Sequence, residues 1–146
     1  MPNFGECYIF GVLYTASSGV SHSAQYAMAE MLDKSVSGEL KFIDHTKEYG
    51  RRSAKMKESL LSNGFHIVYE KDGVNEISDG FFFTVGYGNM SGEELQKELL
   101  RYGISSISLA CTGSTKEGVR ACVSLMKNED LFDKLEERLS QFHHDH

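Results

Sequence analysis

The hydrophobic period of this chain changes at Asn63-Gly64, and the segments on either side must therefore fold differently. Before this pair, residues on one face recur every three or four positions, which is the spacing of an α-helix. That face carries Tyr49, Ser53, Met56 and Leu60. The spacing predicts a helix over about 44–63. The Asn-Gly pair should end it, because both residue types tolerate the left-handed backbone that stops a helix.

Two strands are expected after the change of period. Segment 65–70, FHIVYE, is rich in β-branched and aromatic residues. Segment 80–87, GFFFTVGY, alternates between two faces. One face carries Phe81, Phe83, Val85 and Tyr87, and the other carries Phe82 and Thr84. Because both faces are largely apolar, the second segment is predicted to be a central strand.

Two further helices are predicted from capping boxes, in which a serine and a glutamate three residues later each bond the backbone amide of the other. The first box, Ser91 to Glu94, opens a helix over 91–102. The second box, Ser114 to Glu117, opens a helix over 114–126. The segment between them, 106–111, reads SISLAC and is predicted to be a strand.

A last helix is expected over about 129–142. Leucines recur at every fourth position, Leu131, Leu135 and Leu139, and should face the core. The histidine-rich tail at 143–146 is expected to be frayed.

The element order from residue 44 predicts the fold class α/β (α+β), with a small mixed sheet of about three strands and helices on one face. The strand-helix-strand step over 80–111 favours a parallel, right-handed crossover. Upstream, residues 1–20 suggest an irregular or short extended segment. The face Ala24, Ala27, Met28 and Met31 predicts a helix over 21–37 that lacks an obvious partner.

Composition narrows the function classes. The chain has 146 residues and a formal net charge of −6, which disfavours a broad nucleic-acid surface. It has no apolar run long enough to span a membrane and no basic, then apolar, N-terminal leader. Its cysteines, Cys7, Cys111 and Cys122, are odd in number and form no CxxC, as expected of reduced thiols in a cytoplasmic protein.

No motif by itself makes an active site. The loop TGST, 112–115, offers two readings: an anion held on the amides of the following helix, or a serine cap that uses those same amides. No arginine lies between Arg101 and Arg120 to fix an anion there. The GxG in 86–92 lacks the remainder of a dinucleotide fingerprint. The C-terminal histidines have no rigid frame, so no metal site is expected.

Taken in order, several motifs resemble the C-terminal part of class I/II pyridoxal-phosphate-dependent aminotransferases of fold type I. They are TASSGVSHSAQYAMAEML, YGRR, SDGFFFTVGY and LLRYGISSISLACTGSTKEGVRAC. The resemblance implies that 1–38 is a remnant of the large cofactor domain and that 39–146 is the small domain that closes over the substrate.

The resemblance also implies an activity for the parent protein, the transfer of an amino group between an amino acid and a 2-oxo acid by a homodimer. In the family, the lysine that forms the Schiff base with pyridoxal phosphate lies upstream of a segment like 14–32. This chain alone is therefore expected to hold no cofactor and to be inactive. The alternative is a stand-alone α/β module that binds a ligand or a protein without catalysis.

Site residues carried over from the family concern the substrate carboxylate. There, a small-domain strand typically has a hydrophobic-Arg-hydrophobic-Ser pattern whose guanidinium binds the carboxylate in a bidentate manner. In this chain Ser108 stands near that arginine's place, and Arg101 or Arg120 could reach the site instead. The resemblance places four serines near the subunit interface and the partner's cofactor phosphate, although they could equally cap a helix. These are Ser17, Ser18, Ser21 and Ser23.

Overall fold

The computed structural model describes residues 3–77 and 81–146, with His45 described by its backbone only. The α-helices are α1 (Phe4–Glu6), α2 (Tyr14–Ser17), α3 (His22–Ser37), α4 (Phe42–Ser62), α5 (Gly92–Arg101) and α6 (Glu129–Asp145). A π-helix, Cys7–Leu13, and a 3-10 helix, Leu109–Thr112, complete the helical segments. The strands are β1 (Phe65–Ile67), β2 (Lys71–Asp72), β3 (Asn75–Glu76), β4 (Phe82–Tyr87), β5 (Ile107–Ser108) and β6 (Val119–Cys122). The chain divides into two compact units, Met1–Phe42 and Ile43–His146.

The described part of the first unit is mostly helical, with short non-helical links at 18–21 and 38–41. The irregular or extended segment expected over residues 1–20 is therefore wrong. From Phe4 to Ser17 the chain is one continuous helical run. A capping box between Asn3 and Glu6 opens this run, and it ends at Ser18, whose φ is +55°. The predicted helix at 21–37 is confirmed as α3. None of these helices buries a side chain.

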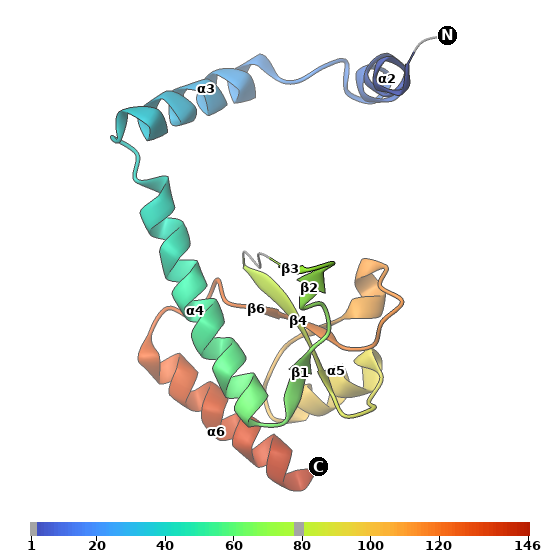
Figure 1. Cartoon of the computed structure of the whole chain (residues 1–146), viewed down its shortest axis with the longest axis vertical. Coiled ribbons are helices and arrows are strands. Elements are labelled where there is room, and N and C mark those ends of the chain that lie inside the picture. The colour runs from blue at the N-terminus through green and yellow to red at the C-terminus, as the bar shows by residue number, and fades with distance from the viewer. Residues whose placement is uncertain (1–2, 78–80) are drawn as a thin grey trace. The chain divides into compact units, whose positions relative to one another are not determined.

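The second unit is built on a four-stranded sheet in the order β1-β4-β6-β5 (Figure 1). Every neighbouring pair in it is antiparallel. The prediction of a mixed sheet of about three strands is therefore wrong, because the observed sheet is antiparallel throughout and has four strands. Strands β4 and β5 do run in the same direction, as the strand-helix-strand step predicted, but β6 lies between them. A separate two-stranded hairpin pairs β2 with β3.

Strand β4 is central, as predicted, because it pairs with β1 on one side and with β6 on the other. Its side chains alternate: Phe83 and Val85 are buried, whereas Phe82 is exposed. Residue 80, where the strand was expected to begin, lies outside the described residues.

The strand β6 occupies the segment where the second capping box predicted a helix, so the helix over 114–126 is wrong. Backbone pairing explains the outcome: Val119 lies opposite Val85, and Cys122 lies opposite Phe82. Gly118, with a φ of +135°, also interrupts any helix that Ser114 could have started. The predicted strand at 106–111 shrinks to the two residues of β5, followed by the 3-10 helix.

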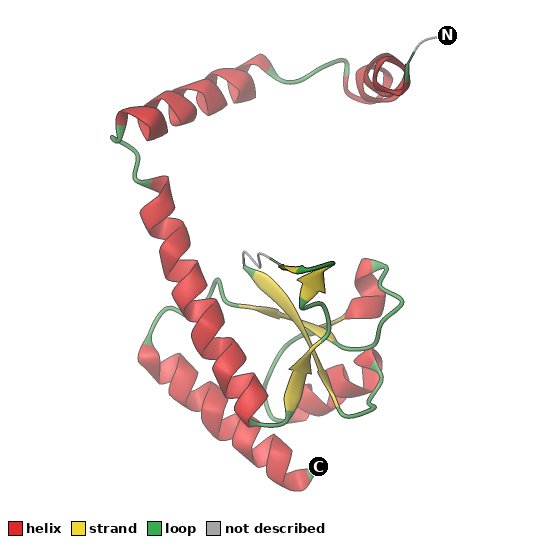
Figure 2. Cartoon of the chain, in the orientation of Figure 1, coloured by secondary structure: helices red, strands yellow, loops and turns green. Residues whose placement is uncertain are grey.

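Three helices, α4, α5 and α6, supply most of the core that covers one face of this sheet (Figure 2). The buried apolar residues of the cluster are Met56, Leu60, Phe65, Phe83, Val85, Leu95, Leu99, Val119, Val123, Phe132, Leu135, Leu139 and Phe142. Of the predicted inner positions of the helix at 44–63, Ser53, Met56 and Leu60 are buried, and Tyr49 is half-buried against the core cluster.

Helix α6 differs from its prediction at both ends. Leu135 and Leu139 are buried, but Leu131 is exposed and Phe132 takes the expected core position. The tail is not frayed, because the helix continues to Asp145. The hydroxyl of Tyr87 lies 2.8 Å from Nδ1 of His143, and His146 stacks on Phe142 with ring centroids 4.4 Å apart.

The beginning of α5 packs backbone against backbone. A Cβ added at Gly92 would lie 2.4 Å from the carbonyl oxygen of Gly118, so the contact requires a glycine at 92. The amide of Gly92 donates to the carboxylate of Glu117 at 2.6 Å. Glu117 therefore caps α5, and the predicted box between Ser114 and Glu117 is not formed. In α5 itself, Ser91 accepts from the amide of Glu94, which is one half of the predicted capping box.

Candidate functional site

The sheet face opposite the helices carries the side chains best placed for a ligand. Strand register puts Thr84 of β4 and Ile107 of β5 on either side of Arg120 in β6. The next pair on the same face is Phe82 and Cys122. Whereas the opposite face is buried, these residues are exposed or half-buried. A short strand thus presents a guanidinium among uncharged neighbours.

Arg120 is held by an aromatic ring. Its guanidinium carbon lies 4.3 Å from the ring centroid of Phe82, which is a cation-π contact. Within the described ranges Arg120 forms no ion pair with a carboxylate. A planar guanidinium with free donors matches the two oxygens of a carboxylate. Arg120 can therefore accept an anionic ligand without breaking a salt bridge.

Arg101, the other arginine candidate, lies at the end of α5 and is already paired. Its guanidinium is 3.0 Å from the carboxylate of Glu98, and its side chain is 74% exposed. The structure does not bring it together with Arg120, which lies on the sheet.

Ser108 is a buried residue at the start of the 3-10 helix. Its hydroxyl accepts from the amide of Ala110 at 3.3 Å, and its own amide donates to the side chain of Gln96 at 3.1 Å. These bonds fix the chain reversal after β5. Both polar groups of Ser108 are thus used within the fold.

The loop 112–115 precedes a strand, so the helix amides that an anion would have used are not there. The hydroxyl of Ser114 accepts from the amide of Lys116 at 3.0 Å and lies 2.7 Å from the hydroxyl of Tyr69. The amine of Lys116 sits 4.5 Å from the centroid of the Tyr69 ring. The loop is therefore fastened to the segment that follows β1.

The four serines of the first unit form local contacts. The hydroxyl of Ser17 donates to the carbonyl of Leu13, and Ser18 ends α2 in the left-handed conformation. The hydroxyls of Ser21 and Ser23 lie 2.9 Å apart, but Ser21 makes no side-chain cap bond to α3. All four are exposed. Their place at an interface stays a prediction.

A cavity of about 250 Å³ opens beside Arg120. Phe82, Ile107 and Arg120 line it from the sheet, Leu135 from α6, and Ser106 from the loop before β5. The hydroxyl oxygen of Ser106 is buried and, in the part of the chain that the structure describes, has no hydrogen-bond partner.

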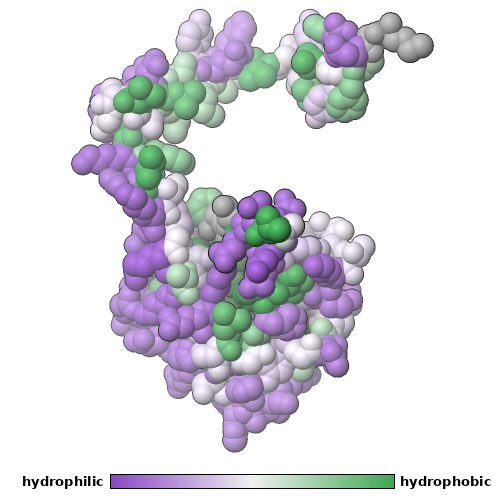
Figure 3. Space-filling model, viewed as in Figure 1, coloured by the Kyte–Doolittle hydropathy of each residue, from purple (hydrophilic) through white to green (hydrophobic). Residues whose placement is uncertain are grey.

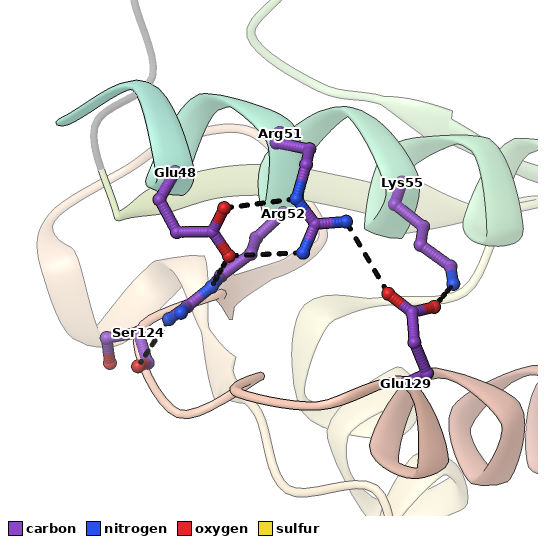
Figure 4. A network of polar contacts seen from close by, with 6 residues as sticks. All are labelled: Glu48, Arg51, Arg52, Lys55, Ser124 and Glu129. Atoms are coloured by element: carbon purple, nitrogen blue, oxygen red, sulfur yellow. Dashed lines mark hydrogen bonds and ion pairs between the residues drawn. The ribbon is translucent and has the colours of Figure 1, made fainter. Parts of the chain in front are cut away.

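A network of charged side chains ties α4 to α6 and to the segment after β6 (Figure 4). Glu48 accepts from Arg51 and Arg52, and Arg52 also donates to the carbonyl of Ser124. Glu129, at the start of α6, pairs with Arg51 and Lys55. Hydrogen bonds from Arg51 and Arg52 lower the pKa of Glu48 from 4.5 to about 2. A hydrogen bond from Lys55 is the main cause of a lowered pKa at Glu129.

This network predicts a pH effect on stability. Since the pKa of Glu48 is lower in the folded chain than in the unfolded chain, its contribution is present above about pH 4.5 and is lost as the pH falls towards 2. Glu48→Gln should therefore show a smaller loss of stability than wild type between pH 6 and pH 2. Urea unfolding at several pH values measures this. Glu137→Gln, on α6 outside the network, is the control, and equal pH slopes for Glu48→Gln and wild type would contradict the prediction.

Two further classes of site are not seen. No group of three or more histidine, cysteine, aspartate or glutamate side chains converges as a metal site among the described residues. Across those residues no helix has both the length and the apolar composition needed to cross a membrane. Compared with known proteins, the chain matches no family model and no curated protein.

Proposed function

We propose that this chain provides the small, substrate-closing domain of a pyridoxal-phosphate-dependent aminotransferase of fold type I, with Arg120 as the residue that binds the substrate carboxylate. The proposal rests on the sequence resemblance and on one observation, the position of Arg120 on β6. Residues Val119-Arg120-Ala121 match the hydrophobic-Arg-hydrophobic part of the family pattern, and they lie in a strand. The fourth position is Cys122, where the family usually has serine.

The surroundings of Arg120 support a carboxylate role. Phe82 stacks against the guanidinium and limits its rotation, so less freedom is lost when a carboxylate binds. The neighbours across the sheet, Thr84 and Ile107, carry no charge that competes for the arginine. Ser108 and Arg101 are both engaged elsewhere, which leaves Arg120 as the preferred candidate among the three.

The cofactor itself does not fit the residues described here. A lysine that forms a Schiff base is normally desolvated in a pocket or placed beside another cation. None of the lysines in this chain is buried. The proposal therefore assigns pyridoxal phosphate to a large domain, as the resemblance implies, and assigns this chain only the recognition of substrate.

Binding of a 2-oxo acid tests the role of Arg120. We expect 2-oxobutanoate to shift the amide NMR signals of β6 and β4 in a saturable way, beyond the effect of sodium chloride at equal ionic strength. Arg120→Gln should weaken this binding by about 10- to 100-fold, since it removes hydrogen bonds to a charged group. Arg101→Gln, which removes an equal charge from α5, should bind like wild type.

Two results would overturn the assignment. If Arg120→Gln binds as tightly as wild type, the carboxylate is held elsewhere. If 2-oxobutanoate shifts the wild-type signals no more than sodium chloride does, the domain does not recognise this substrate class.

A further inference from the structure

The cavity beside Arg120 is lined mainly by apolar side chains and extends to the helix-covered side of the sheet, where Leu135 of α6 contributes to it. Its volume of about 250 Å³ is below the range of roughly 300–1,000 Å³ usual for whole ligands. It therefore suits one part of a molecule rather than a whole cofactor. Phe82, Ile104, Ile107 and Leu135 provide apolar walls on several sides.

The charges around the cavity define the kind of ligand. Among the described residues that line it, Arg120 is the only charged one. A single carboxylate is matched by a single guanidinium, whereas a second carboxylate inside the cavity would have no cation to offset its loss of water. The site thus favours a molecule that is anionic at one end and apolar at the other.

Ser106 gives an independent sign that a polar group is missing. Buried hydroxyls nearly always have a hydrogen-bond partner, yet that of Ser106 has none in the described part of the chain. Its residue lines the same cavity as Arg120. Because its oxygen is buried, the Ser106 side chain must turn into the cavity before its hydroxyl and the Arg120 guanidinium can both donate to one carboxylate.

We propose that this cavity holds the aliphatic side chain of a 2-oxo acid or amino acid whose carboxylate is bound by Arg120 and Ser106. The inference rests on the proposed function, and it assigns the substrate class within it. Substrates with unbranched apolar side chains of about three or four carbons are preferred over dicarboxylic acids. Each methylene that enters the cavity should tighten binding by up to about fourfold, the scale of burying one methylene.

A matched series of 2-oxo acids tests the proposal on the whole chain by NMR titration. We expect 2-oxohexanoate to bind about 15-fold more tightly than 2-oxobutanoate, because it has two more methylenes. We expect 2-oxoadipate, which has the same number of carbons as 2-oxohexanoate, to bind at least about tenfold more weakly than it. Ser106→Ala should weaken all three by about two- to tenfold.

A cavity-filling variant distinguishes binding of the ligand's aliphatic side chain from binding of its carboxylate. Ser105, which is exposed at the cavity rim, is replaced by tryptophan. Ser105→Trp should remove the gain from chain length, so that 2-oxohexanoate binds it no more tightly than 2-oxobutanoate does. Ser140→Trp, on the exposed side of α6, should retain the gain. If Ser105→Trp does not fold, nuclear Overhauser contacts from the terminal methyl of 2-oxohexanoate to Ile104 and Ile107 in wild type decide the same point.

The outcomes distinguish this inference from the proposed function. If 2-oxobutanoate and 2-oxohexanoate bind equally and both depend on Arg120, the cavity takes no side chain but the carboxylate role stands. If the gain from chain length survives Ser105→Trp, or if 2-oxoadipate binds as tightly as 2-oxohexanoate, the cavity is not the specificity site. If no 2-oxo acid binds wild type, the proposed function fails as well.

Discussion

Leu139→Ala should lower the free energy of unfolding by about 3–5 kcal/mol, whereas Leu131→Ala on the same helix should lower it by about 1 kcal/mol or less. Leu139 is 0% exposed and belongs to the core cluster, so its removal leaves a cavity as well as lost apolar burial. Leu131 is 38% exposed and can be shortened without a closed cavity. The two substitutions remove the same atoms from one helix, so the difference reports burial.

Equilibrium unfolding in urea measures both values for the chain as it stands. Helix propensity cancels between the variants, because alanine replaces leucine in each case. Equal losses for the two variants would mean that α6 presents a different face to the sheet. Such equal losses would fit the leucine stripe that the sequence alone predicts, in which Leu131 and Leu139 both face the core.

The contrast between these leucines shows why the sequence predicts the position of α6 correctly but predicts the wrong buried face. Residues four apart on an α-helix drift by about 40°, so Leu131 and Leu139 differ by about 80° in direction. The stripe Phe132, Leu135, Leu139 and Phe142 alternates three- and four-residue steps and follows the helix more closely. Hydrophobic periodicity was sufficient to predict that α3, α4, α5 and α6 exist, and it was less reliable for the face that each helix buries.

The region from residue 106 to 126 could not be predicted locally, because its structure depends on residues far away in sequence. Ser114 and Glu117 have the spacing of a capping box, but Glu117 bonds the amide of Gly92 instead. Val119 to Cys122 form a strand because β4 offers them a pairing edge. Patterns within a short stretch of sequence cannot reveal this pairing edge, because it lies more than 30 residues upstream.

The candidate site was likewise predictable only in part from local sequence. From the sequence alone Arg120 is one of three candidates, and the predicted strand at 106–111 favours Ser108 as the carboxylate position. Once 119–122 is a strand, side-chain alternation alone directs Arg120 to the open face and Val119 to the core. The hydrophobic-Arg-hydrophobic run was the signal that could have found it. The cavity and the orphan hydroxyl of Ser106 have no sequence signature, since they arise from packing between distant segments.

The second large effect that we expect is self-association of the whole chain through the first unit. Eight large apolar side chains in α3 and in the helical segment before it are between 45% and 68% exposed. They are Tyr8, Ile9, Phe10, Val12, Leu13, Met28, Met31 and Leu32. Figure 3 shows apolar residues at the surface of this unit, interspersed with hydrophilic ones. Large exposed apolar side chains gathered in one part of a chain commonly bind another chain.

Light scattering at micromolar concentration should therefore give the chain at least twice its monomer mass of 16.4 kDa. A chain restricted to 43–146 should be monomeric and should keep the unfolding transition of the second unit, because it retains every residue of the core cluster. In the whole chain, Ile9→Ser combined with Phe10→Ser should shift the mass towards the monomer, whereas Thr15→Ser, also exposed, should not. A monomeric mass for the unaltered chain would mean that the first unit covers its own apolar side chains in solution. An associated 43–146 chain would instead place the interface on the second unit, where the exposed side chains Phe81, Phe82 and Leu125 are the next surface to test.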